Sequence, residues 1–200
     1  DYTELDKFEL MQDRYIGNPD RSTLNSLPGF TRNELEKIDK TGVFTNDKVL
    51  FLTFDDWSSD KPINHLLYVL DKHDVQGDFF IRTNYMLNNP NILRALAEAG
   101  HGIGSHTDNH LPFAIGENNL EENATPIIYR SPNVAELIER KEDLLISYNK
   151  LQEVIGDISI NNQPALTTIF RPPTLAMSKV GMEEIFDMGF SHIVSGDFNP

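Results

Sequence analysis

Residues 50–60, LFLTFDDWSSD, decide the fold: an apolar run stops at two adjacent carboxylates, Asp55 and Asp56. The continuous apolar run over residues 48–54 is typical of a parallel strand that is buried on both faces. Two like charges at its end repel each other, and desolvating them costs several kcal/mol each unless something compensates. A bound cation can compensate for one of them. A solvated acidic loop is the other interpretation, and both stay open at this point.

Outward from this stretch, strands and helices are predicted to alternate. Helical spacing of apolar residues marks segments 62–74, 90–99, 133–155 and 181–189, and short apolar runs mark strands at 77–81, 166–170 and 190–194. This alternation indicates an α/β fold of parallel βα units, arranged either as a barrel or as an open doubly wound sheet. In both arrangements the residues that follow the strands meet at the carboxyl edge of the sheet.

Length and composition restrict the class of protein. A chain of 200 residues suits one domain with a short extension. The balance of 17 basic against 31 acidic side chains, a formal charge of −14, argues against nucleic acid or an anionic membrane surface as the partner. The absence of cysteine excludes disulfides and thiolate chemistry. No apolar stretch reaches the roughly 20 residues that a membrane-spanning helix needs.

The N-terminal part has a different pattern. Residues 1–30 show no convincing periodicity, and Thr31 with Glu34 forms the signature of a helix capping box. We therefore expect residues 1–45 to be an N-terminal extension and residues 46–200 to be the main domain. Because the chain begins at Asp1 rather than methionine, earlier removal of a targeting or anchoring segment is compatible with the sequence.

Two histidines suggest what the acidic pair does. His106 and His110 have the spacing that, on one helical turn, would make both imidazoles face the same way. With Asp56 they form a set of three ligands that leaves positions open on a zinc-like divalent ion. Asp55 then stays unligated and can accept a proton from metal-activated water. Histidines at this spacing are also common at surfaces and helix caps.

Other residues near the strand ends allow two interpretations each. Arg171 follows a strand on a backbone stiffened by two prolines, so it either orients Asp55 through a bidentate contact or makes a surface ion pair of little energetic value. Trp57 is either an aromatic wall beside the acidic pair or a residue that fills the core. The remaining histidines, His65, His73, His101 and His192, are interpreted as structural or solvent-exposed.

Four segments in order resemble the first four motifs of the polysaccharide deacetylases, the NodB-like carbohydrate esterase family 4: TFDD at 53–56, HTDNH at 106–110, FRPP at 170–173 and SGDF at 195–198. The resemblance covers residues 48–200. It implies a distorted (β/α) barrel and a metal-dependent amide hydrolase that removes N-acetyl groups from amino-sugar polymers. It also implies peptidoglycan or a chitin-like polysaccharide as the substrate, and an extracellular or cell-envelope location.

The resemblance implies a role for each matching residue. Asp55 matches the catalytic base, and Arg171 matches the arginine that orients it. Asp56, His106 and His110 match the ligands of one divalent ion, for which zinc is preferred and cobalt, nickel and manganese are alternatives. The backbone N–H of Thr174 matches the oxyanion donor, and Asp197 matches the acid that tunes a general-acid histidine. Trp57 and Phe198 are the expected substrate-binding aromatic residues.

The chain departs from the family pattern in three places. Trp57 and Ser58 replace glycine and proline, Phe198 replaces tryptophan, and no leucine-x-histidine motif follows Asp197 before Pro200. We therefore expect a chain that is incomplete at its C-terminus. The alternative is a catalytically inactive module that keeps the fold and binds sugar or cell wall. A phosphoryl-transfer enzyme is a weaker hypothesis, because no glycine-rich phosphate loop accompanies the acidic pair.

Overall fold

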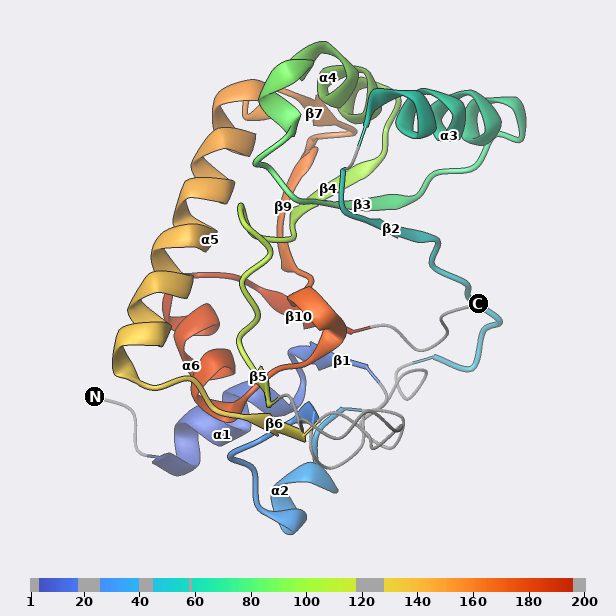
Figure 1. Cartoon of the computed structure of the whole chain (residues 1–200). Helices are drawn as coiled ribbons and strands as arrows, with labels where there is room; N and C mark the ends of the chain where they lie inside the picture. Colours follow the sequence, from blue (N-terminus) through green and yellow to red (C-terminus); the bar gives the residue numbers. More distant parts are fainter. Residues whose placement is uncertain (1–3, 18–25, 40–44, 58, 118–127, 196–200) are drawn as a thin grey trace, which may run out of the picture. The chain divides into compact units, whose positions relative to one another are not determined.

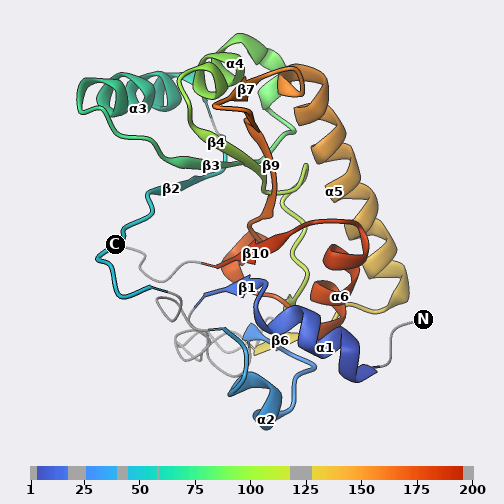
Figure 2. The same ribbon diagram turned by 180° about the vertical axis from the view of Figure 1, so that it is seen from behind.

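The computed structural model describes residues 4–17, 26–39, 45–57, 59–117 and 128–195 (Figures 1 and 2). The chain divides into two compact units. Unit 1 consists of residues 1–47, 112–141 and 171–200, and unit 2 of residues 48–111 and 142–170. The segment predicted as an N-terminal extension thus groups with two later segments of the chain in unit 1.

Unit 2 is built on parallel strands. In spatial order they are β9 (Leu166–Phe170), β4 (Gly102–Ser105), β3 (Asp78–Ile81) and β2 (Thr53–Asp55). Asp55 aligns with Phe80, and Phe80 aligns with Gly104, so these strands end at one shared edge. The pairing of β4 with β9 contains an irregularity between Ile103 and Ser105. The predictions of strands at 77–81 and 166–170 are confirmed.

The predicted helices of unit 2 also form. They are α3 (Asp60–Lys72), α4 (Pro90–Glu98) and the C-terminal part of α5 (Val134–Ile155). Proline stands in the first turn of α4, and Gly100 follows the helix with a φ of 90°, a conformation that only glycine adopts without steric cost. The 3₁₀ helix Met86–Asn88 and a hairpin of β7 (Ser159–Ile160) and β8 (Gln163–Pro164) complete the unit.

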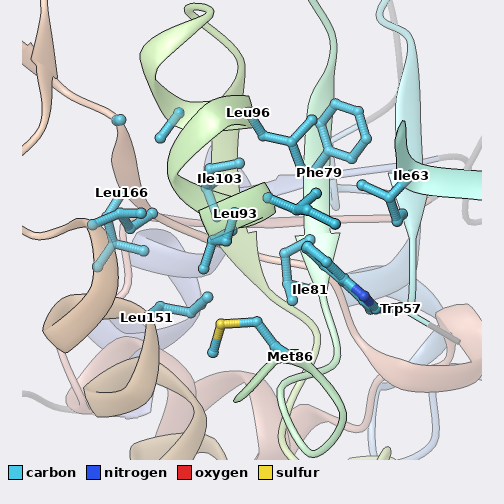
Figure 3. Close-up of a cluster of buried hydrophobic side chains, with 14 of the residues drawn as sticks. Trp57, Ile63, Phe79, Ile81, Met86, Leu93, Leu96, Ile103, Leu151 and Leu166 are labelled. Atoms are coloured by element: carbon cyan, nitrogen blue, oxygen red, sulfur yellow. The ribbon is translucent and has the colours of Figure 1, made fainter. Parts of the chain in front are cut away.

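One hydrophobic core joins these helices to the sheet (Figure 3). Phe79 and Ile81 alternate along β3 and contribute from one face of the sheet, which is the expected period of a strand. The other buried members of the core come mainly from α3, α4, α5, β4 and β9: Trp57, Ile63, Leu70, Met86, Ile92, Leu93, Leu96, Ala97, Ile103, Leu151, Ile155, Ile158, Ala165 and Leu166. This core fixes the strand ends that carry the candidate site.

The apolar run before Asp55 differs from its prediction. Only Thr53–Asp55 form a strand, and the four side chains before it are exposed: Val49 54%, Leu50 82%, Phe51 74% and Leu52 38%. The prediction of a strand over residues 48–54 that is buried on both faces is therefore wrong: residues 48–52 form no strand, and Thr53 and Phe54 are only partly buried. β2 is the end strand of its sheet, and its N-terminal neighbour Leu52 keeps one bond, from the N–H of Asp78 (2.9 Å).

His101 is a buried residue of unit 2 that the fold requires in its neutral form. Its Nδ1 accepts a hydrogen bond from the N–H of Gly77 (3.2 Å), and a protonated imidazole cannot accept at that atom. Burial lowers the pKa of His101, and the neighbouring Asp78 carboxylate only partly opposes this effect. The stabilisation is complete above the ordinary value of about 6.5 and is lost as the pH falls through the lowered folded-state pKa.

We therefore expect the free energy of unfolding of the metal-free protein to decrease between about pH 7.5 and about pH 5.5. The decrease should be smaller in His101→Gln, which has no ionisable group at this position. Urea denaturation at both pH values measures the difference. Equal decreases in the two proteins would show that His101 does not contribute.

Unit 1 contains α1 (Glu4–Gln12), β1 (Tyr15–Ile16), α2 (Arg32–Leu35), β5 (Ile115–Glu117), β6 (Ile128–Arg130), the 3₁₀ helix Pro173–Leu175, α6 (Lys179–Asp187) and β10 (His192–Val194). β1 and β10 pair in parallel, whereas β5 and β6 are antiparallel. The capping box of α2 is confirmed, since Thr31 and Glu34 bond each other's backbone N–H. α1 was not predicted; Phe8 and Met11 are buried, which stabilises a helix that sequence periodicity does not reveal.

None of the helices within the described ranges has the length and apolar character needed to cross a membrane.

Candidate metal centre

The acidic pair lies where β2 ends. Asp55 is the last residue of the strand, and Asp56 follows it with a φ of 69°, a left-handed conformation that aspartate tolerates better than most residues. The N–H of Asp56 donates to the carbonyl of Phe80 on β3 (3.0 Å). The Asp56 side chain remains 51% exposed. The Asp56 carboxylate is therefore not buried. Solvent weakens the repulsion between the carboxylates of Asp55 and Asp56.

The two histidines lie on the segment that follows β4. The N–H of His106 donates to the carbonyl of Ile81 (3.0 Å), which ties the segment to the end of β3. Thr107 and His110 have positive φ values of 66° and 61°, so residues 106–110 form a loop and not the predicted helical turn. Each such conformation costs about 1–3 kcal/mol in a residue other than glycine.

Asp56, His106 and His110 nevertheless converge. The Oδ1 atom of Asp56 lies 4.0 Å from Nε2 of His106 and 3.9 Å from Nε2 of His110. The two imidazole rings are 4.9 Å apart at an interplanar angle of 70°. One ligand atom from each residue lies within 4.8 Å of the others. Two atoms held at about 2 Å from one ion are at most about 4 Å apart, so small side-chain adjustments bring all three atoms to a common ion. Two imidazoles and a carboxylate are suitable ligands for zinc and similar divalent ions.

A polar network holds the loop that carries the histidines. The buried carboxylate of Asp143, on α5, accepts the N–H groups of Asp108 and Asn109 (both 3.0 Å to Oδ2). The buried carboxylate of Asp108 accepts from Thr83 Oγ1 (2.6 Å) and Lys150 Nζ (2.7 Å). The sequence analysis did not single out these residues. The available signal was the position of Asp143 beside Leu144 on the buried face of an amphipathic helix.

Trp57 takes the second of its two interpretations. Its side chain is only 2% exposed and belongs to the hydrophobic core, where Figure 3 shows it in one cluster with Ile81 and Leu93. Its indole Nε1 donates to Oδ1 of Asp60, the first residue of α3 (3.1 Å). A ring buried in this way has no free face on which a sugar could stack, so the expected substrate-binding role is corrected to a core role.

The other predicted site residues belong to unit 1. Arg171 has a buried side chain directly after β9, and Thr174 lies exposed in the 3₁₀ segment with a φ of 64°. Their roles toward Asp55 and the substrate stay predictions. Asp197 and Phe198 lie outside the described residues. Of the remaining histidines, His65 and His73 are exposed and His101 is structural, in line with their interpretation.

A family model described as polysaccharide deacetylase matches residues 42–193. The chain is 33% identical over 66 residues to the peptidoglycan-N-acetylmuramic acid deacetylase PdaA of Bacillus subtilis, covering 33% of this chain and 25% of that protein. It is 28% identical over 96 residues to a chitooligosaccharide deacetylase of Rhizobium leguminosarum bv. trifolii, covering 46% of this chain and 45% of that protein.

The fold is similar to the solved structure of a family 4 carbohydrate esterase from Bacillus anthracis, with a TM-score of 0.51 and 22% identity, covering 72% of this chain and 56% of that chain. The chain thus spans between 25% and 56% of the lengths of these three proteins. The α/β fold class predicted from the sequence, that of the polysaccharide deacetylases, is confirmed. The family match over residues 42–193, most of the chain, shows that the chain belongs to the polysaccharide deacetylase family.

Proposed function

We propose that the protein is a metal-dependent N-deacetylase that removes acetyl groups from an N-acetylated amino-sugar polymer of the peptidoglycan or chitin type. The observation that carries the proposal is the convergence of Asp56, His106 and His110 beside a second carboxylate, Asp55. Family membership supports the reaction class. The names of the relatives, one acting on peptidoglycan N-acetylmuramic acid and one on chitooligosaccharide, support the substrate class without choosing between them.

In this proposal each side chain has a separate task. Asp56, His106 and His110 would hold one divalent ion, for which zinc is our first choice. Such an ion, when bound, supplies a Lewis acid that polarises a carbonyl and lowers the pKa of water. Asp55 accepts a proton from the attacking water at a carboxylate oxygen. The family resemblance adds two roles to the proposal: Arg171 would orient Asp55 and keep it ionised, and the Thr174 N–H would donate to the oxygen that gains negative charge.

The chemistry is the hydrolysis of an amide. Water adds to the acetyl carbonyl carbon as its proton passes to Asp55, which acts as general base. The C–N bond then breaks, the nitrogen takes up a proton, and acetate and a free amine leave. Because the polymers named above belong to cell walls, we further propose an extracellular or cell-envelope location, which the names of the wall-acting relatives support.

The substitution Asp55→Asn tests the assigned base. We expect acetate release to fall by about 10²- to 10⁴-fold, the usual contribution of a general base, while one equivalent of zinc remains bound. Acetate released from peptidoglycan and from chitin oligosaccharides is measured beside the metal content of each protein. Asp71→Asn, the same chemical change at an exposed position on α3, is the matched control.

Unchanged acetate release in Asp55→Asn would remove Asp55 from the mechanism. Polymer binding by the parent protein without any acetate release would contradict the deacetylase proposal as a whole.

A further inference from the structure

We propose that Asp143 is a positioning residue for the metal centre: its carboxylate holds the loop between His106 and His110 in the conformation that turns both imidazoles toward Asp56. Asp143 lies on α5 and contacts no imidazole among the contacts described, so it acts through the backbone of the loop. The inference rests on the metal site of the proposed function and adds a residue that determines how well that site is formed.

The loop needs an external constraint. Thr107 and His110 both have left-handed backbones, a conformation that a β-branched residue such as threonine rarely adopts. Conformations of this kind persist only where the surroundings over-determine them. The hydroxyl of Thr107 is buried and has no hydrogen-bond partner among the residues that the structure describes, so this side chain does not supply the constraint.

Asp143 supplies this constraint on the loop through several hydrogen bonds at once. Its Oδ2 accepts the N–H groups of Asp108 and Asn109 at 3.0 Å each. Its Oδ1 accepts from Nδ2 of Asn109 at 2.7 Å and, more weakly, from the N–H of Asn109 at 3.1 Å. The side chain is 4% exposed, so water does not compete for these bonds. A carboxylate is an acceptor at both oxygens, which is what two adjacent N–H groups and an amide donor require.

The same face of α5 makes two further contacts with the segment that carries the ligands. Ser147 bonds Ser105 (2.7 Å between the hydroxyl oxygens), and Ser105 Oγ in turn accepts the N–H of Thr107 (3.1 Å). Lys150 pairs with Asp108 (2.7 Å). Asp143, Ser147 and Lys150 follow the i, i+4, i+7 spacing that places residues on one face of a helix. A long helix thus fixes the loop at successive turns, with Asp143 bonding the two central residues.

A purely structural carboxylate and a positioning carboxylate make different predictions. If Asp143 only stabilised the fold, its loss would lower stability equally with and without metal, and the folded protein would keep its metal affinity. If Asp143 positions the loop, its loss leaves the relative orientation of the His106 and His110 imidazoles unfixed. The metal affinity of the folded protein then falls, and the ligand geometry changes.

The test compares the zinc dissociation constants of the full chain and its variants, measured by competition with a chelator of known affinity. We expect Asp143→Ala to weaken zinc binding by about 10- to 100-fold, the usual effect of removing an outer-shell partner. Asp143→Asn should weaken it less, because one acceptor oxygen remains. Glu142→Gln changes the charge equally at the neighbouring, exposed position and should leave the affinity unchanged.

Two additional readouts separate positioning from folding. The absorption spectrum of the cobalt-substituted protein should change in the Asp143 variants, because it reports the geometry of the ligands. The melting temperature in excess chelator measures the metal-free fold. Asn109→Ala removes the 2.7 Å side-chain bond to Asp143 and a longer one to Asp108 (3.3 Å), at an exposed residue. If the Asp143 variants fail to fold, the zinc affinity of Asn109→Ala tests the inference in their place.

Zinc affinity and a cobalt spectrum equal to those of the parent in a folded Asp143 variant would overturn the inference and leave the proposed function intact. If the parent itself binds no zinc, the metal site of the proposed function is wrong, and the positioning role is wrong with it.

Discussion

Replacing His106 with alanine is expected to remove stoichiometric zinc binding from the protein. His106 is one of the three side chains whose ligand atoms converge, and its imidazole is 3% exposed. Alanine at this buried position offers no ligand atom in place of the imidazole nitrogen. Outer-shell partners of metal ligands are typically worth 10–100-fold in affinity, and loss of a direct ligand should exceed about 100-fold. Elemental analysis of the purified protein should find about one zinc in the parent and almost none in the variant.

Asp56→Ala should have the same effect with less risk to the fold, because the Asp56 side chain is half exposed. His65→Ala removes an exposed histidine on α3 and controls for adventitious zinc bound by surface imidazoles. Full zinc content in both His106→Ala and Asp56→Ala would show that the ion, if any, is held elsewhere. An equal loss in His65→Ala would show that the assay counts surface binding.

The second large effect is on stability. Trp57→Ala should lower the free energy of unfolding by about 3–5 kcal/mol, the cost of truncating a buried aromatic residue. Trp57 is 2% exposed and packs in the core of unit 2, and its Nε1 bond to Asp60 links it to the start of α3. Denaturant unfolding followed by circular dichroism measures the change, because the variant has no tryptophan left for fluorescence.

Trp57→Phe keeps most of the apolar volume and loses the bond to Asp60, so it should cost only about 1–2 kcal/mol. Comparing the loss in free energy of unfolding of Trp57→Ala with that of Trp57→Phe separates the contribution of packing from that of the hydrogen bond. A stability change below about 1 kcal/mol in Trp57→Ala would be typical of a surface residue. It would return Trp57 to the alternative role of a wall for a sugar ring.

Elements with strong periodicity could be predicted from the sequence. Helices α3, α4 and α5 and strands β3 and β9 follow from apolar spacing together with Pro90 and Gly100, because these signals are local. The exposure of residues 49–52 could not be predicted in this way. An apolar run has the same sequence pattern whether its strand lies inside a sheet or at the end of one. Only the order of the strands in the sheet decides whether the run is buried.

The convergence of Asp56, His106 and His110 could also be predicted, since residues that follow parallel strands meet at one edge. The way in which the loop brings His106 and His110 together could not. The predicted helical turn uses local spacing, whereas the observed loop depends on Asp143, Ser147 and Lys150, which lie far along the chain on α5. Contacts over such separations leave no periodic signal in one sequence. The only sequence feature that indicated these contacts was Asp143 itself, a charged residue beside Leu144 on the apolar face of α5.

The left-handed backbones at Asp56, Thr107 and His110 have a consequence for protein engineering. Glycine adopts such φ values without steric cost, so it is the residue that these positions favour on conformational grounds alone. A library sorted only for resistance to heat or protease would enrich glycine there and would discard two of the three proposed metal ligands, Asp56 and His110. Efforts to make this protein more robust should therefore hold these positions constant and seek their gains elsewhere.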